Sequence, residues 1–249
     1  MHLLLANANT TQAITDLCAA SARAAASPST TITAVTPRFG PAVIASRIEN
    51  AIAGHALLET LAEHAGKTDG VLLAVSHDTA LEAARQLMPC PVLGMTEAAC
   101  LTALTQGGRF GLVTFGSTES YRELITRHGL ATRLAALAGV DATPQQTVAD
   151  PAAVTAKVQA AIAGLVEQGA DSIVLGGAAM AGMAANLTAP VPLLDGIACG
   201  VRLLEALVGL RLPKPSVGSY ALPLGRATTG LGSALTQALA ATGAARNPA

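Results

Sequence analysis

The tripeptide Ser76-His77-Asp78 is the most reactive-looking cluster in the chain. It follows an apolar run that predicts a strand over 70–75, and it precedes an Ala-rich segment that predicts a helix over 79–88. Because histidine titrates near neutral pH, His77 is a candidate general acid or base. Ser76 and Asp78 are its candidate catalytic partners, and Asp78 also suits the N-terminal cap of the following helix.

Polar residues follow two other predicted strands and are candidate ligand contacts. Asn7 and Thr11 come after the first strand of the chain, and Ser117 and Thr118 come after a later one. Hydroxyl and amide groups beside the N-terminus of a helix suit the oxygens of a carboxylate or an imide. The same residue types also favour plain helix capping, and the two roles are compatible.

Paired glycines, Gly176-Gly177, follow a third apolar run and complete the candidate site. Glycine lets a backbone approach a ligand closely. No Lys-Ser or Lys-Thr pair follows them, so this is not a phosphate-binding loop. With Ala178, Val43 and Val75 they form the remaining predicted substrate-binding set. The rim of the site is predicted to carry Arg38, Arg47, Glu49 and Tyr121.

Several of the candidate residues lie in an internal repeat, which consists of two similar segments of the chain. The stretch "DGVLLAVSHDTALEAARQLMPCPVLGMTEAAC" is followed about a hundred residues later by "DSIVLGGAAMAGMAANLTAPVPLLDGIAC". Aligning the aspartates that open the two copies puts Val75 opposite Gly177. After a three-residue deletion, Cys100 falls opposite Cys199. A period this long indicates two similar lobes rather than a solenoid.

Strand-like and helix-like segments alternate along the chain, which predicts an α/β fold with parallel sheets and right-handed crossovers. The predicted strands cover 2–6, 31–36, 70–75, 91–94, 110–114, 172–176 and 190–194. The predicted helices cover 10–25, 46–65, 79–88, 96–106, 118–128, 151–169, 179–187 and 196–209.

The repeat predicts two Rossmann-like lobes related by a pseudo-twofold axis. One lobe is expected over 1–100 together with a returning tail, 206–249, and the other over 101–205. Ligands of open parallel sheets bind beyond the carboxyl ends of the strands. Two facing lobes should therefore enclose a central cleft lined by the strand-end residues of both copies.

The composition narrows the class of partner to a small molecule. The chain has 249 residues, a formal net charge of −1 and 2% aromatic residues, which argues against nucleic acid. No run is long and apolar enough to predict a membrane span or a signal peptide. The four cysteines have no metal-ligand spacing, so we expect no metal site and a reduced, cytoplasmic protein.

Several phrases together resemble the aspartate/glutamate/hydantoin racemase superfamily, especially hydantoin and allantoin racemases. They are "NANTT", "GPAVIASRIENAIAG", "HDTALEAARQLMPCPVLGMTEAA", "LVTFGSTESYRELITRHGL" and "IVLGGAAMAGMAANL…PVPLLDGIACGVRLLEAL". The resemblance covers most of 2–222. It implies two pseudo-symmetric lobes, no cofactor, a homo-oligomer, and two thiols that exchange a proton next to a substrate carbonyl from opposite faces.

The chain departs from this pattern at both thiol positions. Anchoring the resemblance on Asp78 places Val75 at the first thiol slot and Gly177 at the second. These are the two positions that the internal repeat makes equivalent. Neither residue can carry a proton, so a two-thiol mechanism would require Cys100 or Cys199 to enter the site from a predicted helix.

These observations predict a cofactor-independent, racemase-like enzyme that acts on a small carboxylate or a hydantoin-like cyclic amide. Proton transfer next to a carbonyl would proceed without the thiol pair, and His77 is the candidate acid or base. Decarboxylation or hydrolytic ring opening on the same scaffold remains an alternative. A second alternative is a non-catalytic protein that binds the same kind of ligand.

Overall fold

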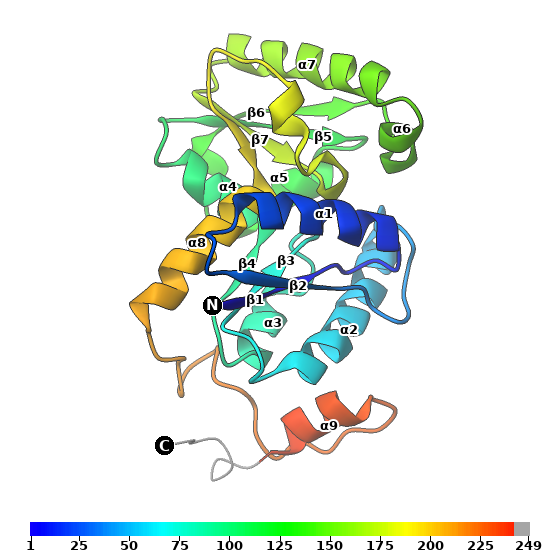
Figure 1. Ribbon diagram of the computed structural model, residues 1–249, viewed down its shortest axis with the longest axis vertical. Helices are drawn as coiled ribbons and strands as arrows, with labels where there is room; N and C mark the ends of the chain where they lie inside the picture. Colours follow the sequence, from blue (N-terminus) through cyan, green and yellow to red (C-terminus); the bar gives the residue numbers. More distant parts are fainter. Residues whose placement is uncertain (242–249) are drawn as a thin grey trace.

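The computed structural model describes residues 1–241, whose strands form two separate, four-stranded parallel sheets (Figure 1). The order in the first sheet is β2-β1-β3-β4, and in the second it is β6-β5-β7-β8. The second order is the first shifted by four strands, so the two sheets share one topology. This confirms the predicted α/β fold with two similar lobes. The strands are β1 His2–Ala6, β2 Thr31–Val35, β3 Gly70–Leu73, β4 Val92–Gly94, β5 Phe110–Phe115, β6 Leu134–Val140, β7 Ser172–Gly176 and β8 Leu193–Asp195.

Helices connect the strands and cover both faces of each sheet, as parallel strands require (Figure 1). The helices are α1 Gln12–Ala25, α2 Arg47–His64, α3 Leu81–Leu87, α4 Met95–Ala103, α5 Glu119–Arg127, α6 Pro144–Ala149, α7 Pro151–Glu167, α8 Gly196–Leu210 and α9 Ser233–Ala240. Among these helices within residues 1–241, none combines the length and apolar character that a membrane crossing requires.

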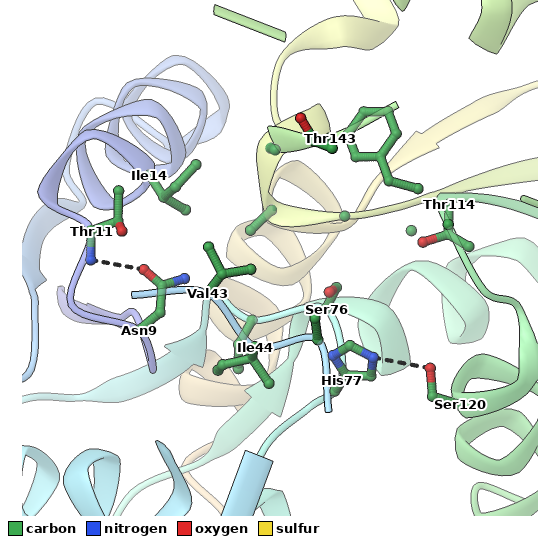
Figure 2. Close-up of a pocket in the computed structure, with 18 of the residues that line it drawn as sticks. Asn9, Thr11, Ile14, Val43, Ile44, Ser76, His77, Thr114, Ser120 and Thr143 are labelled. Carbon is green, nitrogen blue, oxygen red and sulfur yellow. Dashed lines mark hydrogen bonds between the residues drawn. The ribbon is translucent and has the colours of Figure 1, made fainter. Parts of the chain in front are cut away.

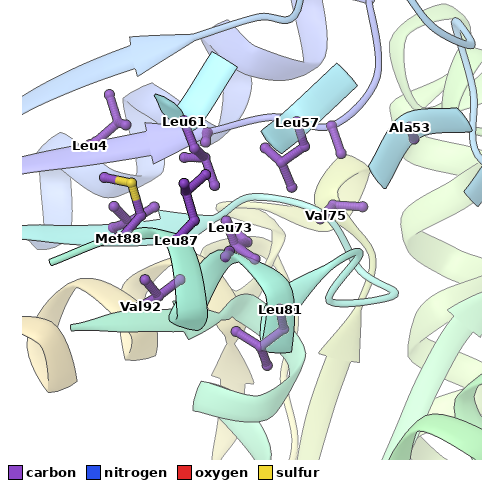
Figure 3. Close-up of a cluster of buried hydrophobic side chains, with 14 of the residues drawn as sticks. Leu4, Ala53, Leu57, Leu61, Leu73, Val75, Leu81, Leu87, Met88 and Val92 are labelled. Carbon is purple, nitrogen blue, oxygen red and sulfur yellow. The ribbon is translucent and has the colours of Figure 1, made fainter. Parts of the chain in front are cut away.

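The central strands of the first sheet are buried on both faces. On one face, Leu4 of β1 and Leu73 of β3 pack in a cluster with Leu57 and Leu61 of α2 (Figure 3). Burying a leucine side chain contributes about 1.5–3 kcal/mol, so this layer fixes α2 firmly on the sheet. Val75 belongs to the same cluster and lies just beyond the end of β3, so the core extends up to the candidate site.

The helices α4 and α8 cross from one lobe to the other. Residues Ala99 and Cys100 of α4 pack with Phe110 of β5, although α4 follows the first sheet in the sequence. In return, Ile197 and Val201 of α8 pack with the first sheet. The two helices also contact each other, where Figure 1 shows them between the sheets. The lobes are therefore joined by exchanged helices and not only by a linker.

Several elements differ from the sequence-based expectation. Strand β6 was not predicted, because its sequence, LAALAGV, is rich in Ala and Leu and lies half-buried at the edge of the second sheet. The helix predicted over 179–187 is instead two short 3₁₀ turns, Ala178–Met180 and Met183–Asn186. Strand β8 begins later than predicted, at Leu193, after the proline of Pro192.

The segment around α9 packs on the first lobe. Helix α9, which was not predicted, packs against α2. The backbone N–H of Gly232 donates a hydrogen bond to Glu59 Oε1 at 2.8 Å. Residues 242–249 of the predicted tail lie outside the described residues.

Candidate active site

A cavity of about 670 Å³ lies between the carboxyl ends of the two sheets. All four predicted strand-end loops contribute to it, two from each lobe. Figure 2 shows its labelled side chains converging from both lobes. The lining residues are Asn9, Thr11, Ala13, Ile14, Ala42, Val43, Ile44, Ala45, Val75, Ser76, His77, Thr114, Phe115, Gly116, Ser117, Ser120, Tyr121, Ala142, Thr143, Gly176, Gly177, Ala178 and Ala179.

The two positions made equivalent by the repeat, Val75 and Gly177, line this same cavity. Gly177 has φ of 179°, an extended conformation that any residue adopts. A Cβ atom placed there would meet only the side chain of Met180, at 3.6 Å. The backbone at position 177 therefore leaves room for a side chain, although the residue there is glycine.

No cysteine is among the described residues that line the cavity. Cys100 is buried in the core of the second lobe, and Cys199 packs against the same cluster. Burial, followed by nearby negative charge, raises the pKa of the Cys100 thiol; burial also raises that of Cys199. Neither sulfur is placed to replace the missing thiols.

His77 lines the cavity and is held by the opposite lobe. Its Nε2 lies 3.1 Å from the Ser120 hydroxyl (Figure 2), and its ring packs at a tilt against Tyr121 with centroids 5.1 Å apart. Its Nδ1 is buried and has no hydrogen-bond partner among the described atoms. Burial, and then the charge of Arg127, lowers the pKa of His77 below 6.5. The imidazole is therefore neutral at pH 7 and able to accept a proton.

Ser76 also lines the cavity, but Asp78 does not. The Asp78 carboxylate is buried and accepts hydrogen bonds from the backbone N–H groups of Thr96 at 3.1 Å and Glu97 at 2.8 Å. Asp78 thus caps α4 rather than the helix that follows it, α3. The geometry gives Asp78 no contact with a ligand in this cavity, because the side chain points into the protein.

The first strand-end loop divides into a buried residue and two exposed to the cavity. Asn7 is fully buried, donates to Thr15 Oγ1 and Asn9 Oδ1, and does not line the cavity. Thr11 lines it, with its hydroxyl donating to the carbonyl of Ala42 at 2.7 Å. Asn9, in the same predicted strand-end loop, lines it as well. Asn7 therefore shapes the loop from behind.

The corresponding loop of the second lobe presents Ser117 to the cavity, whereas Thr118 does not line it. Thr118 is the N-cap residue of α5, and its side chain makes no capping bond. The first turn of α5 adds Ser120 and Tyr121 to the lining. The Tyr121 hydroxyl donates to the carbonyl of Gly176 at 2.8 Å, so this ring connects α5 to the end of β7.

The glycine loop lines the cavity with Gly176, Gly177 and Ala178. At Gly176 a Cβ atom would come within 2.8 Å of the Leu112 side chain, so this glycine is required by packing between strands. Val43 also lines the cavity, within the segment 42–45 that closes one side of it.

Sequence analysis did not place some residues in the cavity lining, and for one of them, Tyr121, a helical pattern was available. The buried residues Tyr121, Leu124 and Ile125 mark the inner face of α5, and His128 falls on the same face one turn later. This spacing would have placed Tyr121 inside rather than at a rim. Ala142 and Thr143 follow β6 and could not be found without that strand.

The cavity lining is uncharged, and a charged region adjoins it. Among the described lining residues there is no Asp, Glu, Lys or Arg. Outside, a second hollow shares His77 and Ser120 and contains Arg127. There Arg47 of α2 forms a bidentate ion pair with Glu123 of α5, with N–O distances of 2.6 and 3.0 Å across the lobes. Within residues 1–241, no cluster of His, Cys, Asp and Glu is arranged to hold a metal.

Comparison with known proteins agrees with the geometry. Hydantoin racemase from Paenarthrobacter aurescens is 32% identical over 233 residues, covering 90% of this chain and 98% of the relative. The structure of allantoin racemase from Klebsiella pneumoniae superposes with a TM-score of 0.89 at 34% identity, covering 95% of this chain and 99% of the other.

Allantoin racemase from Pseudomonas fluorescens gives a TM-score of 0.87 at 30% identity, covering 93% of this chain and 100% of the other. The family model described as Asp/Glu/Hydantoin racemase matches residues 3–204. This match spans both sheets and the cavity between them. The chain therefore belongs to the Asp/Glu/hydantoin racemase family.

Proposed function

We propose that this racemase-like enzyme acts without a cofactor on a small hydantoin-like cyclic amide or carboxylate, moving a proton at the carbon next to a carbonyl. The observation that carries the proposal is the position of His77. Among the described lining residues, His77 and Tyr121 alone are titratable. The Tyr121 hydroxyl is engaged with a backbone carbonyl, and burial raises its pKa. His77 is thus the group able to take up a proton near neutral pH.

The lining favours a cyclic amide over a dicarboxylate. Hydroxyl and amide groups from both lobes offer hydrogen bonds, while Ile14, Val43 and Ile44 supply an apolar wall. A carboxylate buried without a cationic partner would lose its hydration with little compensation. A hydantoin ring is neutral, carries carbonyl and N–H groups, and can place a substituent on the apolar side. The names of the relatives, hydantoin racemase and allantoin racemase, agree with such a ring.

Proton removal beside a carbonyl leaves negative charge on the carbonyl oxygen, and the site offers donors for it. The N-cap residue Thr11 and the first-turn residues Ala13 and Ile14 of α1 line the cavity. The Ile14 N–H already donates to the Thr11 carbonyl at 3.1 Å, whereas the Ala13 N–H precedes this first hydrogen bond of the helix. The first N–H groups of a helix lack partners within the helix. The Ala13 N–H and the Ser117 hydroxyl are therefore the proposed donors to an enolate-like oxygen.

A decarboxylation or a hydrolytic ring opening is the second candidate. It is favoured by the missing acid on the Gly177 side, because inversion needs a proton from the face opposite the base. A reaction that breaks a bond needs only one proton-transfer group. The proposed role of His77 is common to both candidates.

The test is incubation with each enantiomer of 5-methylhydantoin, 5-benzylhydantoin and allantoin in deuterated water. Proton NMR would follow deuterium at the ring carbon, and chiral chromatography would follow inversion. We expect exchange above the uncatalysed rate, falling about 100-fold or more in His77→Gln, because a positioned acid or base contributes that much. Glutamine retains a partner for Ser120, and circular dichroism would verify folding.

Each other outcome is informative. Appearance of a ring-opened acid would assign the hydrolytic alternative. Decarboxylation needs a substrate with a carboxylate, so a 2-substituted malonate would be tested in parallel, and release of CO₂ from it would assign that alternative. Saturable binding with no exchange and no product would identify a binding protein and refute the enzyme. Exchange that persists in His77→Gln would remove His77 from the mechanism.

A further inference from the structure

Both ends of helix α5 contact the loop that follows β3, residues 76–78. At its first turn, Ser120 and Tyr121 contact the His77 imidazole. At its other end, Nε2 of the C-cap residue His128 lies 3.2 Å from Oδ2 of Asp78. The loop belongs to the first sheet and α5 to the second. The opposite lobe therefore helps to set the shape of this loop.

The loop holds backbone conformations that need such support. Asp78 has φ of 47° and Ala80 has φ of 54°, both in the left-handed region that residues other than glycine rarely adopt. Each such residue costs about 1–3 kcal/mol and persists only where its surroundings enforce it. His77 immediately precedes the first of them, so the direction of the imidazole depends on how Asp78 is held.

Three donors converge on the Asp78 carboxylate. Two are the backbone N–H groups of Thr96 and Glu97 at the start of α4, and the third is His128. Space for the carboxylate exists because residue 94 is glycine: a Cβ atom at Gly94 would overlap the Asp78 carboxyl group. Gly94 is the N-cap residue of α4, so Asp78 supplies the cap that this position lacks.

His128 is well placed to make its bond persistent. Its side chain is 10% exposed, and that of Asp78 is fully buried, so water competes little for either group. Its second nitrogen, Nδ1, lies 3.9 Å from Oε1 of Glu97, which is itself paired with Arg85 at 2.5 Å. Removing His128 would leave a buried carboxylate with one donor fewer, which loosens the residue next to His77.

We propose that His128 is a positioning residue for His77: acting through Asp78 from the far end of α5, it fixes the loop so that Nε2 meets Ser120 and Nδ1 stays without a protein partner. This inference rests on the proposed role of His77. His128 lies outside the cavity lining and does not touch a ligand. The orientation of the His77 imidazole then depends on how the two lobes pack, because α5 of the second lobe contacts both His77 and Asp78 of the first.

The experiment compares His128→Phe, which fills the space without a donor, with His128→Gln, which keeps an N–H donor. His55→Phe, at an exposed histidine of α2 outside this cavity, is the matched control. The first readout is ¹⁵N NMR of the His77 ring, which reports its titration and tautomer without any substrate. The second is kcat and KM for exchange at the hydantoin ring carbon.

We expect His128→Phe to shift the His77 titration toward that of a free imidazole and to lower kcat by about 10- to 100-fold, because small misplacements of a catalytic group cost this much. KM should change far less, since no ligand contact is lost. His128→Gln should recover most of kcat, and His55→Phe should match the parent protein.

An unchanged His77 titration and an unchanged kcat in folded His128→Phe would overturn the inference. If that variant does not fold, Gly94→Ala perturbs the same carboxylate from the other side and must shift the His77 titration for the inference to stand. Absence of exchange in the parent protein would instead refute the proposed function, while the NMR readout would still decide whether His128 positions His77.

Discussion

The loops that follow β3 and β7 occupy the same place in the two lobes and differ in almost every chemical respect. The first, Ser76-His77-Asp78, carries polar groups and a strained backbone. The second, Gly177-Ala178-Ala179, carries no functional side chain and begins a short 3₁₀ turn. Both line one cavity. A duplicated scaffold can therefore place its chemistry in one copy and leave the other to supply backbone groups and space.

The helix caps show the same division. In the second lobe Asp195, at the end of β8, caps α8 through the N–H groups of Ile197 and Ala198 and also accepts from Gly182 N–H at 2.5 Å. In the first lobe the cap residue of α4 is Gly94, and the carboxylate comes from Asp78 instead. Placing the carboxylate in the loop ties the loop to α4 through a side chain, whereas in the second lobe the carboxylate at the strand end reaches the segment after β7 through the Gly182 N–H.

The largest expected effect comes from placing a cysteine at both vacant thiol positions, one in each lobe. We expect Val75→Cys combined with Gly177→Cys to gain inversion of a 5-substituted hydantoin about 100-fold or more above either single variant, because acid–base groups would then flank the ring. Gly177 tolerates a side chain in its extended conformation. Chiral chromatography would measure inversion, and a thiol-alkylating reagent should abolish the gain. Equal rates in the double and single variants would show that the positions do not face one ligand.

The glycines of the two lobes should differ next most strongly. Gly94→Ala forces its Cβ into the Asp78 carboxyl group and should destabilise the protein by about 1–3 kcal/mol, the usual cost of overpacking. Gly177→Ala meets only ordinary contact with Met180 and should change stability by less than about 0.5 kcal/mol. Urea unfolding followed by circular dichroism measures both. Similar losses at the two sites would contradict the asymmetry.

The smallest expected effect is on pH dependence. Burial, then Arg127, lowers the folded-state pKa of His77 below 6.5, so between that pKa and 6.5 the unfolded state binds the extra proton and this group's contribution to stability rises with pH. A neutral base stays available in that window, so exchange should fall only below pH 6.5. Arg127→Gln should move this acidic limb upward in a pH–rate profile. An acidic limb at or above 6.5 in the parent protein would contradict a neutral, buried His77.

The sequence could predict much of the fold because local patterns and tertiary structure agree there. The segments 70–75 and 172–176 are apolar except for Ser172 and are buried along their whole length, as helix-covered parallel strands require. Sequence-based prediction missed β6, because this edge strand is rich in Ala and Leu, a composition that helices also have. It also failed at 179–187, where a chain of helix-forming residues turns twice instead.

The amino-acid sequence by itself determined that Val75 and Gly177 are equivalent and that His77 stands at a strand end, because the repeat and the strand boundaries are local properties. Only the tertiary structure decided that Asp78 and Asn7 turn inward, that Ser120 and Tyr121 enter the site, and that His128 reaches Asp78. These contacts join residues from different helices, strands and loops, and those of Ser120, Tyr121 and His128 join the two lobes. Their geometry depends on how the sheets and the exchanged helices pack, which no local pattern encodes.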